Sequence, residues 1–178
     1  LLDVIDKTIS PMGGRLLKRW VALPLKNKNK IINRHEVVSY LLKKQPILKA
    51  IQTNIKCIGD IERLISKVAT GKVSPREVVQ LKNSLEAILP IKKEAENAKN
   101  NAIKTIGKNL QDCKLLREKI TNTLNEDAPV FIQKGNAIAN GVSEELDELR
   151  SIAKGGKDYL NKMLERETER TGINSLKI

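Results

Sequence analysis

The feature that most constrains the fold is a long amphipathic pattern at residues 143–170. Its apolar positions advance by three and four residues, the spacing of a helix that packs along a coiled-coil seam. These positions are Leu146, Leu149, Ala153, Gly156, Leu160 and Met163. Ser143 is a suitable N-cap, and two glutamates follow in the first turn, where the helix dipole favours negative charge. Because other helices must cover such a stripe, the pattern predicts an all-α fold: a helical bundle with one long protruding amphipathic helix, about 40 Å long.

Two adjacent glycines interrupt this long helix at Gly155 and Gly156. Each costs about 1 kcal/mol of helix stability relative to alanine. Since Gly156 lies on the seam, we expect it to be a structural anchor that permits the close approach of another helix or a bend.

Shorter helices are predicted before this one. A first helix is predicted to begin at Ser10–Pro11 and end before Pro24, and a second to begin at Asn27 and end before Pro46. A third runs through Ile58–Val68 and ends at Gly71. A fourth begins at Ser74–Pro75, where Glu77 completes a capping box, and reaches Pro90. On the second of these we expect Ile31, His35, Val38 and Leu42 to share the packed face. Residues 91–125 are expected to be helical with interruptions, and residues 127–141 to form a small β-hairpin or an ordered loop. We therefore divide the chain into a helical core, 1–142, and a long helix, 143–178.

The segment TISPMGGRLLKRWVALPL, residues 8–25, holds adjacent glycines and the only tryptophan. It lacks the glycine, lysine and serine or threonine spacing of a phosphate-binding loop. We interpret it as a tightly packed helix in which Gly13 permits close approach and Trp20 is a buried core anchor.

The formal charge of +12 is concentrated at the beginning of the chain, because residues 1–56 contain 12 basic and 3 acidic groups. A positive field of this kind suits a polyanionic partner. Arg15, Lys18 and Lys28 are the candidate phosphate contacts. Most of the other lysines are expected to form a solvated surface.

No catalytic, metal or cofactor site is predicted. Cys57 and Cys113 are far apart and His35 is the single histidine, so no zinc spacing occurs. We expect both cysteines to be reduced and buried, and His35 to pack rather than act as a base. No signal peptide or membrane-length apolar run is evident, which favours a cytoplasmic, non-enzymatic domain. The chain starts without Met and both ends look cut from a longer protein.

Four segments occur in a particular order: LLDVIDKTISPMGGRLLKRWVALPL, NRHEVVSYLL, GDIERLISKVATGKVSPREVVQLKNSL and SEELDELRSIAKGGKDYLNKMLERETERTGINSLKI. Together they resemble the core (lever) domain of the MutS family of DNA mismatch-repair proteins. The resemblance covers essentially the whole chain, although residues 91–125 match only in helical character. Asp60 lies in the GDIER segment and is taken as a further structural anchor.

The resemblance implies an all-helical structural and transmitting domain between a DNA clamp and an ATPase, both outside this chain. TGINSLKI would end where the first clamp strand begins. The parent protein would bind ATP and Mg²⁺, act on mismatched double-stranded DNA in response to DNA damage, and form a homodimer. Other domains of the same chain would contact this one. No mismatch wedge and no Walker motif occur here, so no catalytic or cofactor residue is assigned.

Two alternatives remain open from the sequence. The first is a free-standing basic helical domain that binds nucleic acid non-specifically through phosphates, with a steep salt dependence. The second is a scaffold that dimerises through the seam of the long helix.

Overall fold

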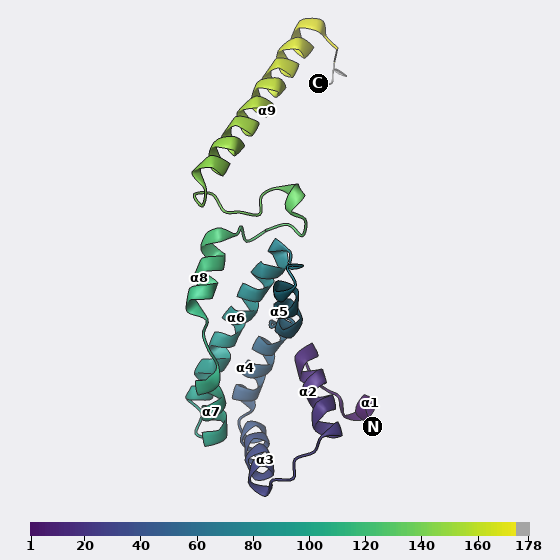
Figure 1. Cartoon of the computed structure of the whole chain (residues 1–178), viewed down its shortest axis with the longest axis vertical. Coiled ribbons are helices and arrows are strands. Elements are labelled where there is room, and N and C mark those ends of the chain that lie inside the picture. Colours follow the sequence, from purple (N-terminus) through teal and green to yellow (C-terminus); the bar gives the residue numbers. More distant parts are fainter. Residues whose placement is uncertain (174–178) are drawn as a thin grey trace. The chain divides into compact units, whose positions relative to one another are not determined.

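The computed structural model describes residues 1–173, which form nine α-helices and one 3-10 helix and contain no β-strand (Figure 1). In chain order the helices are α1 (Leu2–Ile5), α2 (Pro11–Ala22), α3 (Lys28–Lys43), α4 (Gln45–Lys56), α5 (Ile61–Ala69), α6 (Pro75–Glu96), α7 (Asn101–Asn109), α8 (Lys114–Thr123), η1 (Ile132–Lys134) and α9 (Glu144–Thr171). The all-α fold class is thus confirmed. None of the described helices is long and apolar enough to cross a membrane.

The chain divides into two compact units, unit 1 (Leu1–Ala137) and unit 2 (Ile138–Ile178). In unit 1 the central element is α6, which packs against α4, α5, α7 and α8. One buried cluster comprises Leu64, Leu81 and Leu85, and a second comprises Ala95, Ala98 and Ile103. The two clusters lie along the two halves of α6, so this helix holds the unit together.

The start of α6 is the capping box that the sequence predicts. Ser74 Oγ accepts a hydrogen bond from the Glu77 backbone N–H, and the Glu77 carboxylate accepts one from the Ser74 N–H at 2.9 Å. The expected end at Pro90 is wrong, because α6 continues to Glu96. Pro90 lies on the exposed side, whereas Leu85 and Ala95 are buried on either side of it, so packing holds the helix through the missing backbone bond.

Beyond α6 the chain turns back through a close contact at Gly107 of α7. A Cβ at this position would lie 2.7 Å from the Glu96 backbone nitrogen and 2.9 Å from Ala95 Cβ. Only a residue without a side chain allows the two backbones to approach so closely. The glycine that permits close helix packing is therefore Gly107, which the sequence analysis did not single out.

The packed face expected for α3 needs correction. It carries Val37 and Leu41, whereas His35, Val38 and Leu42 are exposed. The helix that begins after Asn27 ends before Pro46 as expected, and Pro46 then stands in the first turn of α4, where its missing N–H has no partner to lose.

Residues 126–137 form an ordered loop rather than a hairpin. The loop is closed by a hydrogen bond of 3.0 Å from the Asn125 N–H to the Ala137 carbonyl. Its backbone turns where Gly135 and Asn136 adopt positive φ angles of 70° and 59°. Ala128 is 1% exposed, so the loop has a core contact of its own.

In unit 2 the long helix α9 is confirmed from its N-cap onward. Ser143 Oγ accepts from the Leu146 N–H at 3.3 Å, and the helix ends at Gly172 in the left-handed conformation. Arg150 fixes the loop before it by donating to the Ile138 carbonyl at 2.8 Å and to Asn140 Oδ1 at 3.0 Å. The first clamp strand expected at TGINSLKI falls largely outside the described residues 1–173.

Candidate functional site

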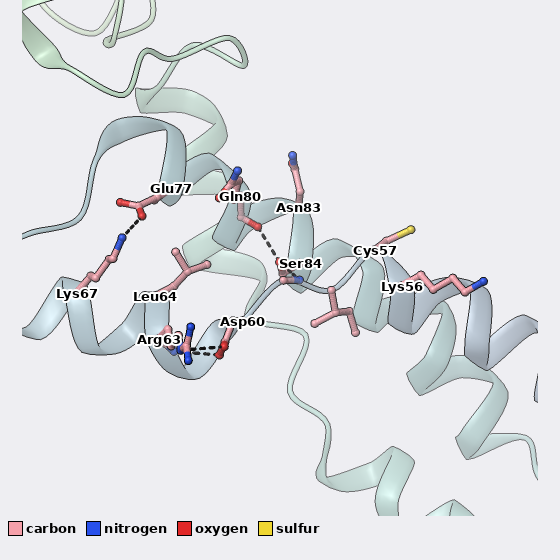
Figure 2. Close-up of a pocket in the computed structure, with 12 residues that line it drawn as sticks. Lys56, Cys57, Asp60, Arg63, Leu64, Lys67, Glu77, Gln80, Asn83 and Ser84 are labelled. Atoms are coloured by element: carbon pink, nitrogen blue, oxygen red, sulfur yellow. Dashed lines mark hydrogen bonds and ion pairs between the residues drawn. The ribbon is translucent and has the colours of Figure 1, made fainter. Parts of the chain in front are cut away.

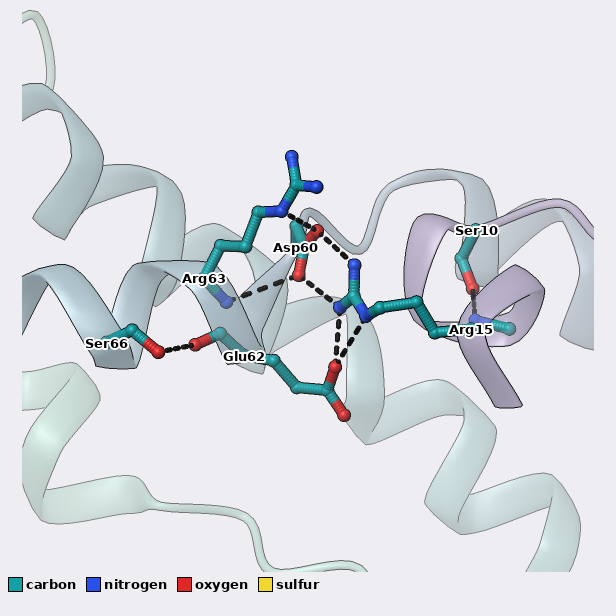
Figure 3. A network of polar contacts seen from close by, with 7 residues as sticks. Ser10, Arg15, Asp60, Glu62, Arg63 and Ser66 are labelled. Atoms are coloured by element: carbon teal, nitrogen blue, oxygen red, sulfur yellow. Dashed lines mark hydrogen bonds and ion pairs between the residues drawn. The ribbon is translucent and has the colours of Figure 1, made fainter. Parts of the chain in front are cut away.

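The most extensive polar network in the described chain centres on Arg15 of α2 (Figure 3). Its guanidinium donates to both carboxylate oxygens of Asp60, from Nη1 at 2.8 Å and from Nη2 at 2.7 Å. The same group donates to Glu62 Oε2, from Nε at 2.9 Å and from Nη2 at 2.5 Å. This forked geometry is the strong form of an arginine–carboxylate contact. These contacts join Arg15 to residues that lie 45 and 47 positions later in the sequence.

Local sequence signals build each side of this network. On α2, Ser10 Oγ caps the helix by accepting from the Gly13 N–H at 3.1 Å. A Cβ on Gly13 would lie 3.1 Å from the same Ser10 Oγ, so this glycine relieves crowding within its own helix start and not between helices. On α5, Asp60 is the N-cap and accepts from the Arg63 N–H at 3.3 Å. Asp60 is thus both a helix cap and the acceptor for Arg15.

The charges in the network stabilise one another. The Arg15 side chain is 38% exposed and that of Asp60 is 16% exposed, so solvent screens the pair only in part. Hydrogen bonds from Arg15 lower the pKa of Asp60 to about 2, and Asp60 and Glu62 raise the pKa of Arg15. The carboxylate is therefore ionised throughout the physiological range.

A cleft of about 590 Å³ lies between α5 and the first half of α6 (Figure 2). Its rim carries an ion pair between Lys67 and Glu77. Hydrogen bonds from Lys67 and from Ser74 lower the pKa of Glu77 to about 2. The cleft is lined by Lys56, Cys57, Ile58, Gly59, Asp60, Arg63, Leu64, Lys67, Glu77, Gln80, Asn83 and Ser84.

Ser84 at the base of this cleft has a structural role. It is 2% exposed, and its Oγ accepts from the Gly59 N–H at 3.0 Å and donates to the Gln80 carbonyl at 2.8 Å. A hydroxyl with both capacities used, and with no adjacent base among its partners, is not an activated nucleophile. Ser84 therefore joins α6 to the segment before α5 at this cleft.

The three candidate phosphate contacts have different surroundings in the structure. Arg15 donates to two carboxylates, so its guanidinium is engaged within the domain, and its role as a phosphate contact stays a prediction. Lys18 and Lys28 have exposed side chains and remain predicted contacts. The sequence missed the second acceptor, Glu62, although the two acids of the GDIER segment flank the start of a helix and offered the signal.

Trp20 is not a buried core residue. Its side chain is 43% exposed, and the Arg34 guanidinium lies 3.6 Å from the centre of its ring. Arg34 also lines an apolar recess with Trp20, Val37 and Ile106. Trp20 thus contacts Arg34 of α3 through a cation–π interaction at the surface, beside apolar side chains of α3 and α7.

Neither cysteine behaves as expected from its residue type. Cys57 is exposed and Cys113 is half-buried, so the expectation that both are buried is wrong. Cys113 begins α8 with a positive φ of 46°. Within residues 1–173 no group of histidine, cysteine and acidic side chains is placed to hold a metal ion.

The long helix α9 has no buried residue, and its seam residues from Leu149 to Met163 are exposed together with neighbouring apolar residues. Tyr159 is 69% exposed and Leu149 is 57% exposed. A Cβ on Gly156 would meet no atom within 4 Å in the described chain, so the expected close approach at this glycine is not made within it. A contiguous apolar stripe of this kind marks an interaction surface.

Comparison with known proteins identifies related chains. A family model described as MutS domain III matches residues 1–175. The DNA mismatch repair protein MutS of Flavobacterium johnsoniae is 66% identical over 178 residues, which is all of this chain and 20% of that protein. The proteins of the same name from Christiangramia forsetii and Bacteroides fragilis are 65% and 54% identical over the whole chain. The chain spans about a fifth of the length of the curated relatives it matches.

Proposed function

The chain belongs to the MutS domain III family, and from this premise we propose that it is the structural and transmitting core domain of a DNA mismatch-repair ATPase. In this proposal it links a DNA clamp to an ATPase domain, both of which lie outside the chain. The parent protein binds ATP and Mg²⁺, acts on mismatched double-stranded DNA in the cytoplasm, and is a homodimer. The domain itself, residues 1–142 with the long helix at 143–178, carries out no catalysis.

The observation that carries the proposal is helix α9. It has 28 residues, and at about 1.5 Å per residue it extends roughly 40 Å. Because none of its residues is buried, its stability in the parent depends on helices that pack along the exposed stripe. A helix supported in this way is stiff enough to pass a displacement from one end to the other.

The alternative of phosphate binding by a free-standing basic domain is less well supported. Its central residue, Arg15, is neutralised by Asp60 and Glu62. What remains is a set of separate exposed lysines, which is the ordinary composition of a solvated surface.

The test interrupts α9 in the full-length protein. Lys154 is exposed in the middle of the helix, and Lys154→Pro removes one backbone hydrogen bond and kinks the helix at a cost of about 3 kcal/mol. Lys154→Ala is the matched control, since it removes the same charge and keeps the helix. The readouts are binding to a mismatched duplex without nucleotide, ATP hydrolysis without DNA, and the rate of DNA release after ATP is added.

We expect the proline variant to keep nucleotide-free DNA binding and DNA-free hydrolysis, and to slow ATP-driven release at least tenfold relative to the alanine variant. Equal release by the two variants would show that an intact α9 is not required for transmission, and the proposal would then be abandoned.

A further inference from the structure

Helix α2 is fastened to unit 1 in an unusual way. None of its 12 residues is buried, and it is not among the closely packed helix pairs of the described chain, which involve α3 to α8. The two buried clusters that hold the other helices of this unit do not include α2.

Two side chains of α2 make charged or cation–π contacts with other helices in the described residues. Arg15 forks between Asp60 and Glu62 at the start of α5, and Trp20 lies beneath Arg34 of α3. Figure 3 shows the Arg15 side chain reaching from α2 to the two carboxylates. Charge–charge contacts at a partly exposed site weaken as salt is added, whereas buried apolar contacts do not.

We propose that Arg15, Asp60 and Glu62 form an electrostatic latch. When the latch opens, α2 is released from the rest of unit 1 while α4 to α8 stay folded. This inference does not depend on the proposed function. In this proposal the ion-pair network controls whether α2 stays attached, and raising the ionic strength opens the network.

The open state leaves no poorly hydrated carboxylate without a partner at the start of α5. Asp60 keeps its capping hydrogen bond from the Arg63 N–H, and Arg63 Nε lies 3.4 Å from Asp60 Oδ2. Glu62 has a side chain that is 66% exposed and is readily hydrated. The latch can thus open without removing the cap of α5 and without burying a charge.

Protonation does not operate the latch near neutral pH. Arg15 holds the pKa of Asp60 at about 2, so the carboxylate stays ionised until strongly acidic conditions. Salt, in contrast, screens the exposed Glu62 arm of the network directly.

The test is hydrogen–deuterium exchange of the full-length protein, with mass spectrometric readout of peptides from residues 11–22 and 75–96. Arg15→Gln removes the charge and keeps the length and polarity of the side chain. Arg19→Gln is the matched control, because it removes the same charge from the same helix at an exposed position that has no ion pair among the described residues. Both variants and the unmodified protein are measured at 0.05 M and 1 M NaCl.

At low salt we expect Arg15→Gln to speed exchange in residues 11–22 about fivefold and to leave residues 75–96 unchanged. Arg19→Gln should leave both segments unchanged. At 1 M NaCl the unmodified protein should approach the exchange rate of Arg15→Gln, whereas the variant itself should respond little to salt.

A double variant supplies an independent check. If Arg15 acts through Glu62, then Arg15→Gln with Glu62→Gln should exchange no faster in residues 11–22 than Arg15→Gln alone. The proposal is overturned if Arg15→Gln leaves residues 11–22 unchanged, which means that other contacts hold α2. It is equally overturned if residues 75–96 speed up to the same extent, which means that the network supports the whole fold.

Discussion

The close approach of α6 and α7 at Gly107 makes a sharp prediction for Gly107→Ala. The added Cβ would lie 2.7 Å from the Glu96 backbone nitrogen and 3.0 Å from the Ala95 carbonyl carbon. Both are backbone atoms and cannot rotate out of the way, so the two helices must move apart. Their separation disturbs the cluster of Ala95, Ala98 and Ile103, which is buried beside the contact.

The magnitude follows from two opposing effects. Overpacking a well-packed core costs about 1–3 kcal/mol, and replacing a helical glycine by alanine returns up to about 1 kcal/mol. Because the obstruction is backbone, we place the cost near the upper end and expect a net loss of about 1–2 kcal/mol. For a chain of this length each kcal/mol lowers Tm by about 2–4 °C, so the expected fall is about 2–8 °C.

The assay is thermal and urea unfolding of the chain, followed by far-ultraviolet circular dichroism. Lys104→Ala on the exposed side of α7 controls for any change in that helix, and should shift Tm by less than 2 °C. Gly156→Ala in α9 controls for helix propensity without a clash, since nothing lies within 4 Å of its added Cβ. It should raise helicity. A Gly107→Ala chain as stable as the unmodified one would refute the close packing of α6 and α7.

Three further outcomes are expected. Leu85→Ala removes a leucine that is 8% exposed in the first core cluster and should lower the free energy of unfolding by about 2–4 kcal/mol, measured by urea denaturation. Ser84→Ala removes the part-buried hydrogen bond from the Gly59 N–H to Ser84 Oγ and should cost about 0.5–1.5 kcal/mol in the same assay, whereas a neutral result would mean that water replaces the hydroxyl. On folding, the pKa values of Asp60 and Glu77 fall from 3.8 and 4.5 to about 2, so the stability that these carboxylates contribute is complete above about pH 5 and is lost as the pH falls toward 2. The urea midpoints at pH 7 and pH 5 should therefore be alike, and the midpoint at pH 3 should be lower. An unchanged midpoint at pH 3 would contradict the ion pairs.

The sequence by itself determined the class of fold and the beginnings of the principal helices. Asn27, Ser74 and Ser143 each cap the helix that their position predicts. These contacts join atoms no more than three residues apart, so the local chain contains all the information they require. The length and one-sided pattern of α9 are local in the same sense. The four ordered segments likewise sufficed to indicate the family.

Tertiary structure decided how those helices meet. Val37 and Val38 are adjacent apolar residues on α3, and only the neighbouring helices determine that Val37 is packed and Val38 exposed. Pro90 lies within a helix because buried residues on either side of it hold that helix together. Trp20 lies at the surface, where the Arg34 guanidinium of α3 stacks on its ring.

The role of Arg15 shows the physical reason most clearly. Its charge and its place on a capped helix are features of the sequence, and they were equally consistent with binding a phosphate. The carboxylates that it binds lie 45 and 47 residues away, so only the folded chain brings them within 3 Å of its guanidinium. A cap depends on neighbours along the chain, whereas an ion pair between helices depends on the packing of everything between them.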